Sequence, residues 1–119
     1  MKYLCLGYHD EKAWEALSDA ERRAILIESF AYDDALRKGG HYLDGTALQG
    51  SRTATTLRFE SGKVFVTDGP FAQTREQLGG IMVVEARDLN NAIQLMSQLP
   101  CMRPGGCLEI RPINERLSS

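Results

Sequence analysis

The sequence predicts an α+β fold of the ferredoxin-like, split βαβ type. Two observations support this fold class. The predicted elements follow the order strand, helix, strands, helix, strand, which is the order of that fold. The strands are also apolar on both faces, whereas two helices can cover only one face of such a sheet. The predicted helices span 19–38 and 89–99, and the predicted strands span 2–8, 53–59, 63–67, 81–86 and 107–113.

The N-terminal third of the chain predicts one strand and one long helix. The strand at 2–8 is interrupted by the charged run 9–12, after which Trp14 lies in a loop or short helical turn. Ser18 and Glu21 have capping-box spacing, so a helix begins there. The helix ends at Gly39-Gly40, which supplies a left-handed cap. Its predicted core-facing stripe combines small and large apolar side chains, namely Ala20, Ala24, Ile27, Phe30, Ala31, Ala35 and Leu36.

The middle and the C-terminal third predict short strands and a second helix. A weak extended segment at 41–48 precedes two strands that Ser61-Gly62 joins as a hairpin. The run 81–86 is strongly β-like. Asp88 caps a helix that Pro100 stops, and the last strand places Leu108, Ile110 and Pro112 on one face.

The apolar character of both strand faces predicts a homodimer. Ile81 and Val83 point to one face of the sheet, while Met82 and Val84 point to the other. The helices cover one of these faces. A second copy of the chain is the simplest cover for the other face.

Composition excludes several classes of protein. The 119 residues are 43% hydrophobic and 25% charged, which fits one globular domain over residues 1–119. A net charge of −2 and a pI near 5.7 argue against nucleic acid and anionic membranes as partners. No apolar run is long enough to cross a membrane or to form a signal peptide. Cys5, Cys101 and Cys107 form neither a disulfide framework nor a metal spacing, so we expect a cytoplasmic protein with reduced thiols.

Residues 67–80 form the most unusual segment of the chain. Asp68 can fold back onto the backbone two residues on, Gly69 tolerates positive φ, and Pro70 fixes its own φ. Thr74 and Gln77 have the spacing of a capping box, which predicts a short helical turn. Gly79-Gly80 then permits a close backbone approach. A connection of about thirteen residues that contains an aromatic side chain, Phe71, is typical of a functional loop.

These residues resemble a known family. Asp68-Gly69-Pro70-Phe71, followed by Thr74, Glu76 and Gly79-Gly80, is similar to the signature of the DGPF branch of the YCII-related proteins, and the resemblance extends from Met1 to Pro112. It implies a ferredoxin-like chain that pairs into a dimeric α+β barrel. It also implies a small-molecule site at the dimer cleft, without specifying an activity.

Asp68 and His41 are the candidate catalytic residues. Asp68 can act as a general base or can anchor a polar substrate, and its structural alternative is an Asx-turn that closes the loop. His41 follows the helix terminator and can shuttle protons near pH 7, and its alternative is a solvated side chain at a helix C-terminus. YCII-related proteins outside the DGPF branch typically pair a helical histidine with an aspartate. Here that histidine position falls at Glu28 or Ser29, so the dyad does not carry over.

The predicted substrate-binding residues surround the same loop and the sheet. Arg111 can offer a bidentate fork to an anionic ligand, although strand arginines are more often solvent-facing or ion-paired. Tyr3 and Tyr8 lie on opposite faces of the first strand, so at most one can line the cleft, and Tyr3 is the predicted one. The remaining predicted contacts come from the central loop, namely Gly69, Pro70 and Phe71.

No cofactor, nucleotide or metal motif is present in the sequence. We therefore expect a dimeric small-molecule protein whose site carries out proton transfer or elimination, of the lyase or isomerase type, without a cofactor. The alternatives are a non-catalytic ligand-binding or regulatory accessory module, including one linked to transcription, and a loop that only seals the dimer.

Overall fold

The computed structural model describes residues 1–117 and shows an α+β fold built on antiparallel strands. Four strands form the main sheet in the order β2-β5-β1-β6. Two further strands, β3 and β4, pair only with each other. The main-sheet strands are β1 (Lys2–Asp10), β2 (Tyr42–Ala47), β5 (Glu76–Glu85) and β6 (Cys107–Pro112), and the separate hairpin consists of β3 (Thr55–Glu60) and β4 (Lys63–Asp68).

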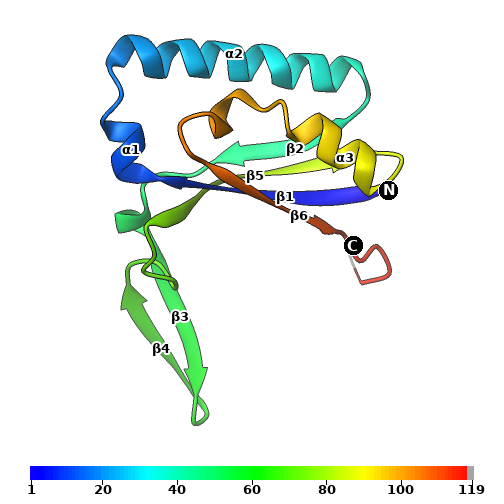
Figure 1. The fold of residues 1–119 in the computed structure, drawn as a ribbon. Helices are drawn as coiled ribbons and strands as arrows, with labels where there is room; N and C mark the ends of the chain where they lie inside the picture. Colours follow the sequence, from blue (N-terminus) through cyan, green and yellow to red (C-terminus); the bar gives the residue numbers. More distant parts are fainter. Residues whose placement is uncertain (118–119) are drawn as a thin grey trace.

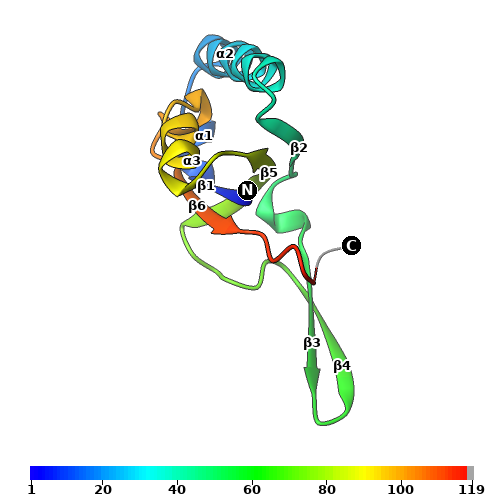
Figure 2. The same cartoon turned by 90° about the vertical axis from the view of Figure 1, so that its right-hand side faces the viewer.

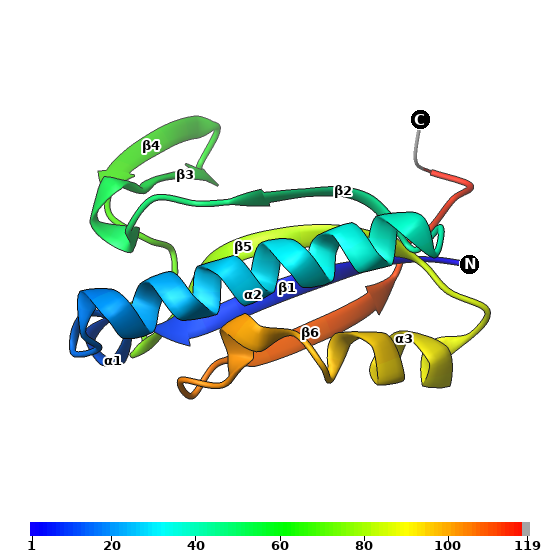
Figure 3. The same ribbon diagram turned by 90° about the horizontal axis from the view of Figure 1, so that it is seen from above.

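The helices lie together on one face of the main sheet (Figure 1). They are α1 (Glu11–Glu15), α2 (Asp19–Lys38) and α3 (Leu89–Met96), with 3₁₀ turns η1 (Ser51–Thr53) and η2 (Pro100–Met102). The β3–β4 hairpin points away from the helices, on the opposite side of the sheet (Figures 1 and 2). From above, α2 runs over β1 and β5, α3 lies along the outer side of β6, and the hairpin lies beyond β2 (Figure 3). The chain therefore has a helix-covered face and an uncovered face.

Local sequence signals position these elements as predicted. Ser18 and Glu21 form the reciprocal capping box of α2. The helix ends where Gly40 adopts a φ of 79°, which an L side chain rarely adopts. Asp88 caps α3 by accepting a hydrogen bond from the backbone N–H of Asn91. The turn of the β3–β4 hairpin has positive φ at both central residues, Ser61 and Gly62, as a type I′ turn requires.

The core lies between the helices and the covered face of the main sheet. Its fully buried side chains come from alternate positions of β1 and β5, from α2 and α3, and from the segments after β5 and α3: Tyr3, Cys5, Leu36, Val84, Ala86, Ala92, Met96 and Leu99. Leu108 and Ile110 of β6 pack against them, as the sequence predicted. Burial raises the pKa of the Cys5 thiol to about 11, so this cysteine is a neutral core residue.

The predicted core stripe of α2 is wrong in most of its members. Ile27 and Phe30 are 61% and 65% exposed, and only Leu36 of that stripe is buried. The helix instead turns its Ile25 and Tyr32 side toward the body of the protein, and the Tyr32 hydroxyl donates to the Leu95 carbonyl oxygen at 2.6 Å. Tyr32 and Leu36 therefore mark the buried side of the helix, whereas the two largest members of the predicted stripe, Ile27 and Phe30, lie on its solvent side.

Three predicted boundaries also differ from the structure, and the first is the start of β5, which lies at Glu76 instead of residue 81. β1 continues to Asp10, where the side chain caps α1, so the charged run does not end the strand at Tyr8. α3 ends at Met96, and Pro100 begins η2 instead of stopping the helix directly.

Within residues 1–117, no helix is long and apolar enough to cross a membrane.

Candidate functional site

The uncovered face of the main sheet carries an apolar centre between two polar rims. Strand register places its side chains in two rows, because directly paired residues point to the same face. From β2 to β6, the first row is Asp44, Val83, Leu4 and Arg111, and the second row is Thr46, Ile81, Leu6 and Glu109. We call these eight residues the open face. Its four central side chains are only half-buried, which leaves apolar surface exposed to solvent.

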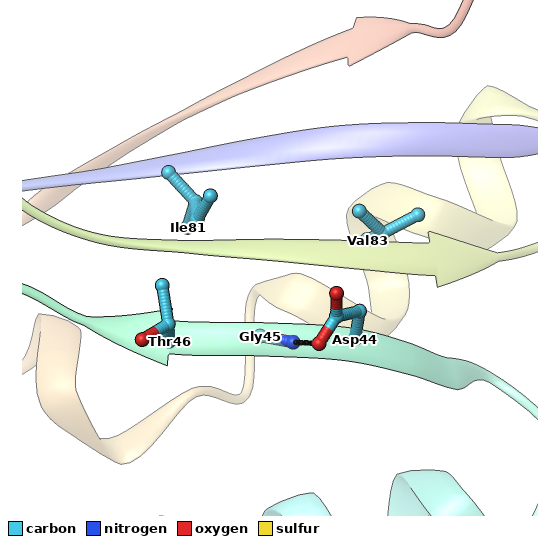
Figure 4. A pocket seen from close by; sticks show the side chains of 5 residues that line it. All are labelled: Asp44, Gly45, Thr46, Ile81 and Val83. Atoms are coloured by element: carbon cyan, nitrogen blue, oxygen red, sulfur yellow. Dashed lines mark hydrogen bonds between the residues drawn. The ribbon is translucent and has the colours of Figure 1, made fainter. Parts of the chain in front are cut away.

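A shallow depression lies at the β2 side of the open face. Asp44, Thr46, Ile81 and Val83 line it together with Gly45, and their side chains project to the same side of the two strands (Figure 4). Its volume is only about 50 Å³, which is enough for water but not for a substrate. The carboxylate of Asp44 accepts a hydrogen bond from the backbone N–H of Gly45 at 2.8 Å. One chain alone therefore does not enclose a ligand on this face.

Arg111 lies at the β6 rim of the open face, where it is ion-paired. Its Nε donates to Glu109 Oε2 at 2.7 Å. The Glu109 carboxylate and, more weakly, the phenol of Tyr8 raise the pKa of Arg111 against a small effect of desolvation. The planar guanidinium has five donors, and this bond occupies one of them. Arg111 is thus on the uncovered face, as expected of a ligand-binding residue, but it already has an acidic neighbour.

The prediction that Tyr3 contacts substrate is wrong. Tyr3 is 1% exposed in the hydrophobic core, and its hydroxyl contacts the sulfur of Met1 at 3.7 Å. Tyr3 shares the covered face with Cys5, whereas alternation puts Tyr8 on the open face with Leu4 and Leu6. Sequence alternation correctly separated the two tyrosines, but only the position of the helices decides which face is covered. Tyr8 is therefore the tyrosine available to a ligand on this face.

Asp68 ends β4 at the base of the hairpin, where it pairs in register with Thr55. Its carboxylate makes no hydrogen bond or ion pair with any residue in 1–117, so the expected Asx-turn does not form. The backbone closes this point instead, since Gly69 N–H donates to the Ala54 carbonyl oxygen at 2.8 Å. Thr56 Oγ1 donates to the carbonyl oxygen of Gly69, which has a φ of 103°. Asp68 is consequently an exposed carboxylate on a backbone that does not depend on it.

The rest of the central segment is a loop over 69–75, without the predicted helical turn. The Thr74 hydroxyl donates to the Glu76 carbonyl oxygen, and Gln77 donates to the Ala72 and Thr74 carbonyls, so the capping-box pair makes other bonds. Phe71 is 75% exposed, and Arg58 of β3 lies over its ring, 5.2 Å from the centroid. Pro70 is half-buried beside it. The predicted contacts Gly69, Pro70 and Phe71 thus stay together with Asp68 at the hairpin base.

His41 lies at the opposite end of β2 from the hairpin. Its ring Nδ1 is 2.8 Å from the Glu85 carbonyl oxygen, where it can donate as the Nδ1–H tautomer. Its backbone N–H donates to the Leu36 carbonyl oxygen and closes the helix end. An open hollow of about 350 Å³ lies beside His41. It is lined by the N-terminal residue, the end of α2 and the segment where β5 ends. β2 spans about 20 Å between this point and the hairpin connection, so His41 and Asp68 do not form a pair within one chain.

Sequence reasoning missed a second polar cluster, which lies where β1 meets η1. The Glu11 carboxylate accepts hydrogen bonds from the Ser51 backbone N–H, at 2.8 Å, and from the Ser51 hydroxyl. These bonds lower the pKa of Glu11, and the nearby His9 and Arg52 add to the effect against desolvation. The ring of His9 lies directly against Gly79, where a Cβ would come within 2.3 Å of it. The pair Gly79-Gly80 predicted a close approach of the backbone to another group, but the sequence did not indicate that this group is the His9 ring.

The comparisons with known proteins identify the family. The family model of the YCII-related domain matches residues 1–116. The chain belongs to the YCII-related family. An uncharacterised protein of Rhizobium meliloti (strain 1021) is 32% identical to this YCII-related protein over 114 residues, which cover 95% of the chain and 92% of that relative.

A solved structure shares the fold at much lower sequence identity. The 5-chloro-2-hydroxyhydroquinone dehydrochlorinase of Burkholderia phenoliruptrix AC1100, in complex with 2,5-dihydroxybenzoquinone, superposes with a TM-score of 0.59. The match covers 96% of this chain and 94% of that chain at 12% identity. At this identity the likeness shows the fold alone. Among residues 1–117, no group of three or more His, Cys, Asp or Glu side chains could hold a metal ion.

Proposed function

We propose that this YCII-related protein is a homodimer of the DGPF branch that binds a small molecule between its subunits. Its acid/base site would be of the lyase or isomerase type and would use no cofactor. The observation that carries the proposal is the open face, an apolar sheet surface between polar rims that one chain leaves uncovered. The strand order β2-β5-β1-β6 also fits the split βαβ arrangement, whose free face stacks on a second sheet in a dimeric barrel.

The charges on the open face favour a particular dimer. Asp44 lies at the β2 rim and Arg111 at the β6 rim of the same row. A two-fold axis parallel to the strands would place the β2 rim of one chain over the β6 rim of its partner. Asp44 would then face Arg111 of the second copy twice in the dimer, while the apolar centres stack. This arrangement would also enclose the shallow depression from above.

Asp68 supports acid/base chemistry because its carboxylate is not used by the fold. An exposed carboxylate without an intramolecular partner is available to accept a proton from a ligand. The dehydrochlorinase with a similar fold is bound to a hydroxylated quinone, and loss of HCl from a chlorinated hydroquinone, the reaction in its name, requires a group that accepts a proton. By analogy we propose a small hydroxylated or acidic ring compound as the ligand class, held by Tyr8 and by the guanidinium donors of Arg111 that Glu109 and Asp44 of the second copy leave free.

The alternative function is a non-catalytic ligand-binding or regulatory module. The separation of His41 from Asp68 favours it, since a binding module needs only shape and a few polar anchors and no paired acid and base. Conversion of a bound compound distinguishes the two functions. The enzyme would transform a ligand and lose turnover in Asp68→Asn, whereas the module would bind the same compound unchanged.

The dimer is tested by sedimentation equilibrium of the wild-type protein, Ile81→Asp and Ile27→Asp. Ile81 lies in the centre of the open face, whereas Ile27 is an exposed apolar residue on the outer side of α2 and provides the matched control. We expect a dimer for the wild type and for Ile27→Asp, and a monomer for Ile81→Asp, because a charge cannot be buried unpaired in the interface. A monomeric wild type, or a dimeric Ile81→Asp, would contradict the proposal.

The ligand class is tested by calorimetric titration with 2,5-dihydroxybenzoquinone as the first probe. We expect saturable binding that Arg111→Leu weakens at least about tenfold, since it removes the cationic anchor. Lys12→Leu is the control for charge alone, because Lys12 is exposed on α1. Equal weakening by both variants would show that only net charge matters and would refute the role of Arg111.

A further inference from the structure

The β3–β4 hairpin has two chemically different faces. Leu57 pairs with Val66 and Phe59 pairs with Val64, so these four side chains share one face. The other face carries Thr56, Arg58, Glu60, Lys63, Phe65 and Thr67. Arg58 and Glu60 form an ion pair there at 3.9 Å. The first face, which we call the apolar face of the hairpin, has no polar side chain along its outer two pairs.

Nothing in residues 1–117 covers the apolar face of the hairpin. Its side chains are between 58% and 72% exposed, and because they belong to two adjacent cross-strand pairs they form one continuous apolar patch. β3 and β4 pair with each other and not with the main sheet. A lone two-stranded hairpin is marginally stable at best in water, and it requires packing against another surface to persist.

The hairpin projects on the same side of the sheet as the open face. The helices lie on one side of the main sheet and the hairpin extends to the other, in both perpendicular views (Figures 1 and 2). Strands of six residues reach about 20 Å, whereas facing sheets pack about 10 Å apart. A second chain seated on the open face would therefore lie beside the hairpin, which is long enough to pass the sheet of that chain and reach its helix layer.

We propose that the hairpin is an arm that packs its apolar face against a second copy of this chain. This inference rests on the proposed dimer and names the element that completes its interface. A second copy is favoured over any other occupant because the hairpin projects from the same side of the chain as the open face, and both apolar surfaces lack a cover. In a two-fold dimer, the arm of each chain packs against the other chain. One interface then covers the open face and the apolar face of the hairpin of both chains.

The buried area agrees with a stable dimer. A buried apolar side chain removes on the order of 100 Å² from water. The four side chains on the apolar face of the hairpin are 58–72% exposed, so covering them would remove roughly 400 Å² per chain from water, about half of what each partner contributes to a standard interface. The four residues at the centre of the open face are already partly buried within one chain, so they add a smaller apolar area. The arm is therefore the part that raises the interface to the size of a specific one.

The arm also places Asp68 at the contact between the two chains. Asp68 pairs with Thr55 two positions from the Leu57–Val66 pair, so its side chain lies on the same face as the apolar residues. Phe71 lies over Arg58, on the opposite face. The second copy that covers the apolar face would border Asp68 and exclude water from it on one side. The site around Asp68 is thus incomplete in a single chain and is completed by the partner.

Matched substitutions on the two faces test the arm. Phe59→Thr alters the apolar face and Phe65→Thr makes the same change on the opposite face, with similar exposures of 72% and 51%. Threonine retains a β-favouring side chain, so both hairpins can still form. We expect Phe59→Thr to raise the dimer dissociation constant at least about tenfold and Phe65→Thr to change it by less than about threefold. Sedimentation equilibrium measures both.

The outcomes separate this inference from the proposed dimer. If the wild type is a dimer and both variants dissociate equally, the arm is refuted while the dimer stands. A monomeric wild type refutes both. Amide hydrogen exchange of the unmodified protein gives an independent measurement, in which we expect protection of 57–59 and 64–66 that increases with protein concentration. Rapid exchange of these amides in the dimer would show that the hairpin is free for some other occupant, which overturns the inference.

Discussion

Replacing Gly79 by alanine is expected to destabilise the protein because the ring of His9 occupies the space of a side chain at this position. A Cβ at position 79 would lie 2.3 Å from His9 Cε1 and 2.4 Å from Nδ1. Favourable contacts between heavy atoms have separations of about 3.5–4.0 Å, so the ring would have to move by more than about 1 Å. Gly79→Ala should therefore destabilise the protein, even though no positive φ is recorded for this glycine.

The magnitude follows from two opposing effects. Overpacking of this kind costs about 1–3 kcal/mol. Restricting the unfolded chain by replacing glycine with alanine stabilises by about 0.4–1 kcal/mol. The net loss should be about 1–2 kcal/mol, which lowers the melting temperature by roughly 3–8 °C in a domain of this size. When His9→Ala removes the obstacle, only the second effect remains, and Gly79→Ala should become neutral or slightly stabilising.

Urea unfolding of the four proteins in this double-mutant cycle is the assay, at one protein concentration because dimer stability depends on it. Gly7→Ala is the control, since a Cβ there would meet only ordinary contacts of 3.6 and 3.7 Å. We expect this variant to be at least as stable as the wild type. An equal cost of Gly79→Ala with and without the imidazole would refute the reasoning, because the clash with His9 would then not be the cause.

Four further predictions concern single side chains. The hydrogen bonds from Ser51 lower the pKa of Glu11, so they stabilise the fold above the unfolded pKa of about 4.5. This stabilisation is lost as the pH falls through the folded pKa. In urea unfolding, Glu11→Gln should therefore destabilise the protein more at about pH 7 than at about pH 3. Asp68→Ala should leave the melting temperature unchanged or raise it, since the Asp68 carboxylate forms no hydrogen bond within residues 1–117. A drop of several degrees would show instead that Asp68 stabilises the loop as an Asx-turn. Tyr32→Phe should cost about 0.5–1.5 kcal/mol by removing the bond between α2 and the Leu95 carbonyl, and an unchanged stability would show that this bond contributes nothing. The buried Cys5, with a pKa of about 11, should resist a thiol reagent at pH 8 while exposed Cys107 reacts, and rapid modification of Cys5 would contradict its place in the core.

The local conformation of the chain was predictable because its causes are local. A capping box at Ser18 and Glu21, an aspartate cap at Asp88 and a turn at Ser61-Gly62 act over a few residues, and the structure forms all three. Alternation along β1 and β5 correctly indicated strands with two apolar faces. The order of these elements indicated an antiparallel α+β fold before any contact was known.

The tertiary structure decided which side of each element is inside. Tyr3 and Tyr8 alternate equally well in the sequence, but the helices cover the face of Tyr3 and make it core. The stripe of α2 had the correct period and the wrong rotation, because Tyr32, which lies outside that stripe, packs against α3 while Ile27 and Phe30 remain exposed. Periodicity in the sequence shows which residues share one face of a helix or strand. Only contacts between distant segments decide whether that face points to the core or to solvent.

The candidate site shows the same division. The sequence by itself determined that residues 68–71 are a conformationally restricted segment that carries a carboxylate. It also determined that this chain has more apolar strand surface than two helices can cover. Only the tertiary structure decided that His41 is remote from Asp68, that Glu11 and His9 meet η1 and Gly79, and that the hairpin extends from the uncovered side of the sheet. The physical reason is that turns and caps depend on neighbours in the chain, whereas a site depends on contacts whose sequence separation the local pattern does not encode.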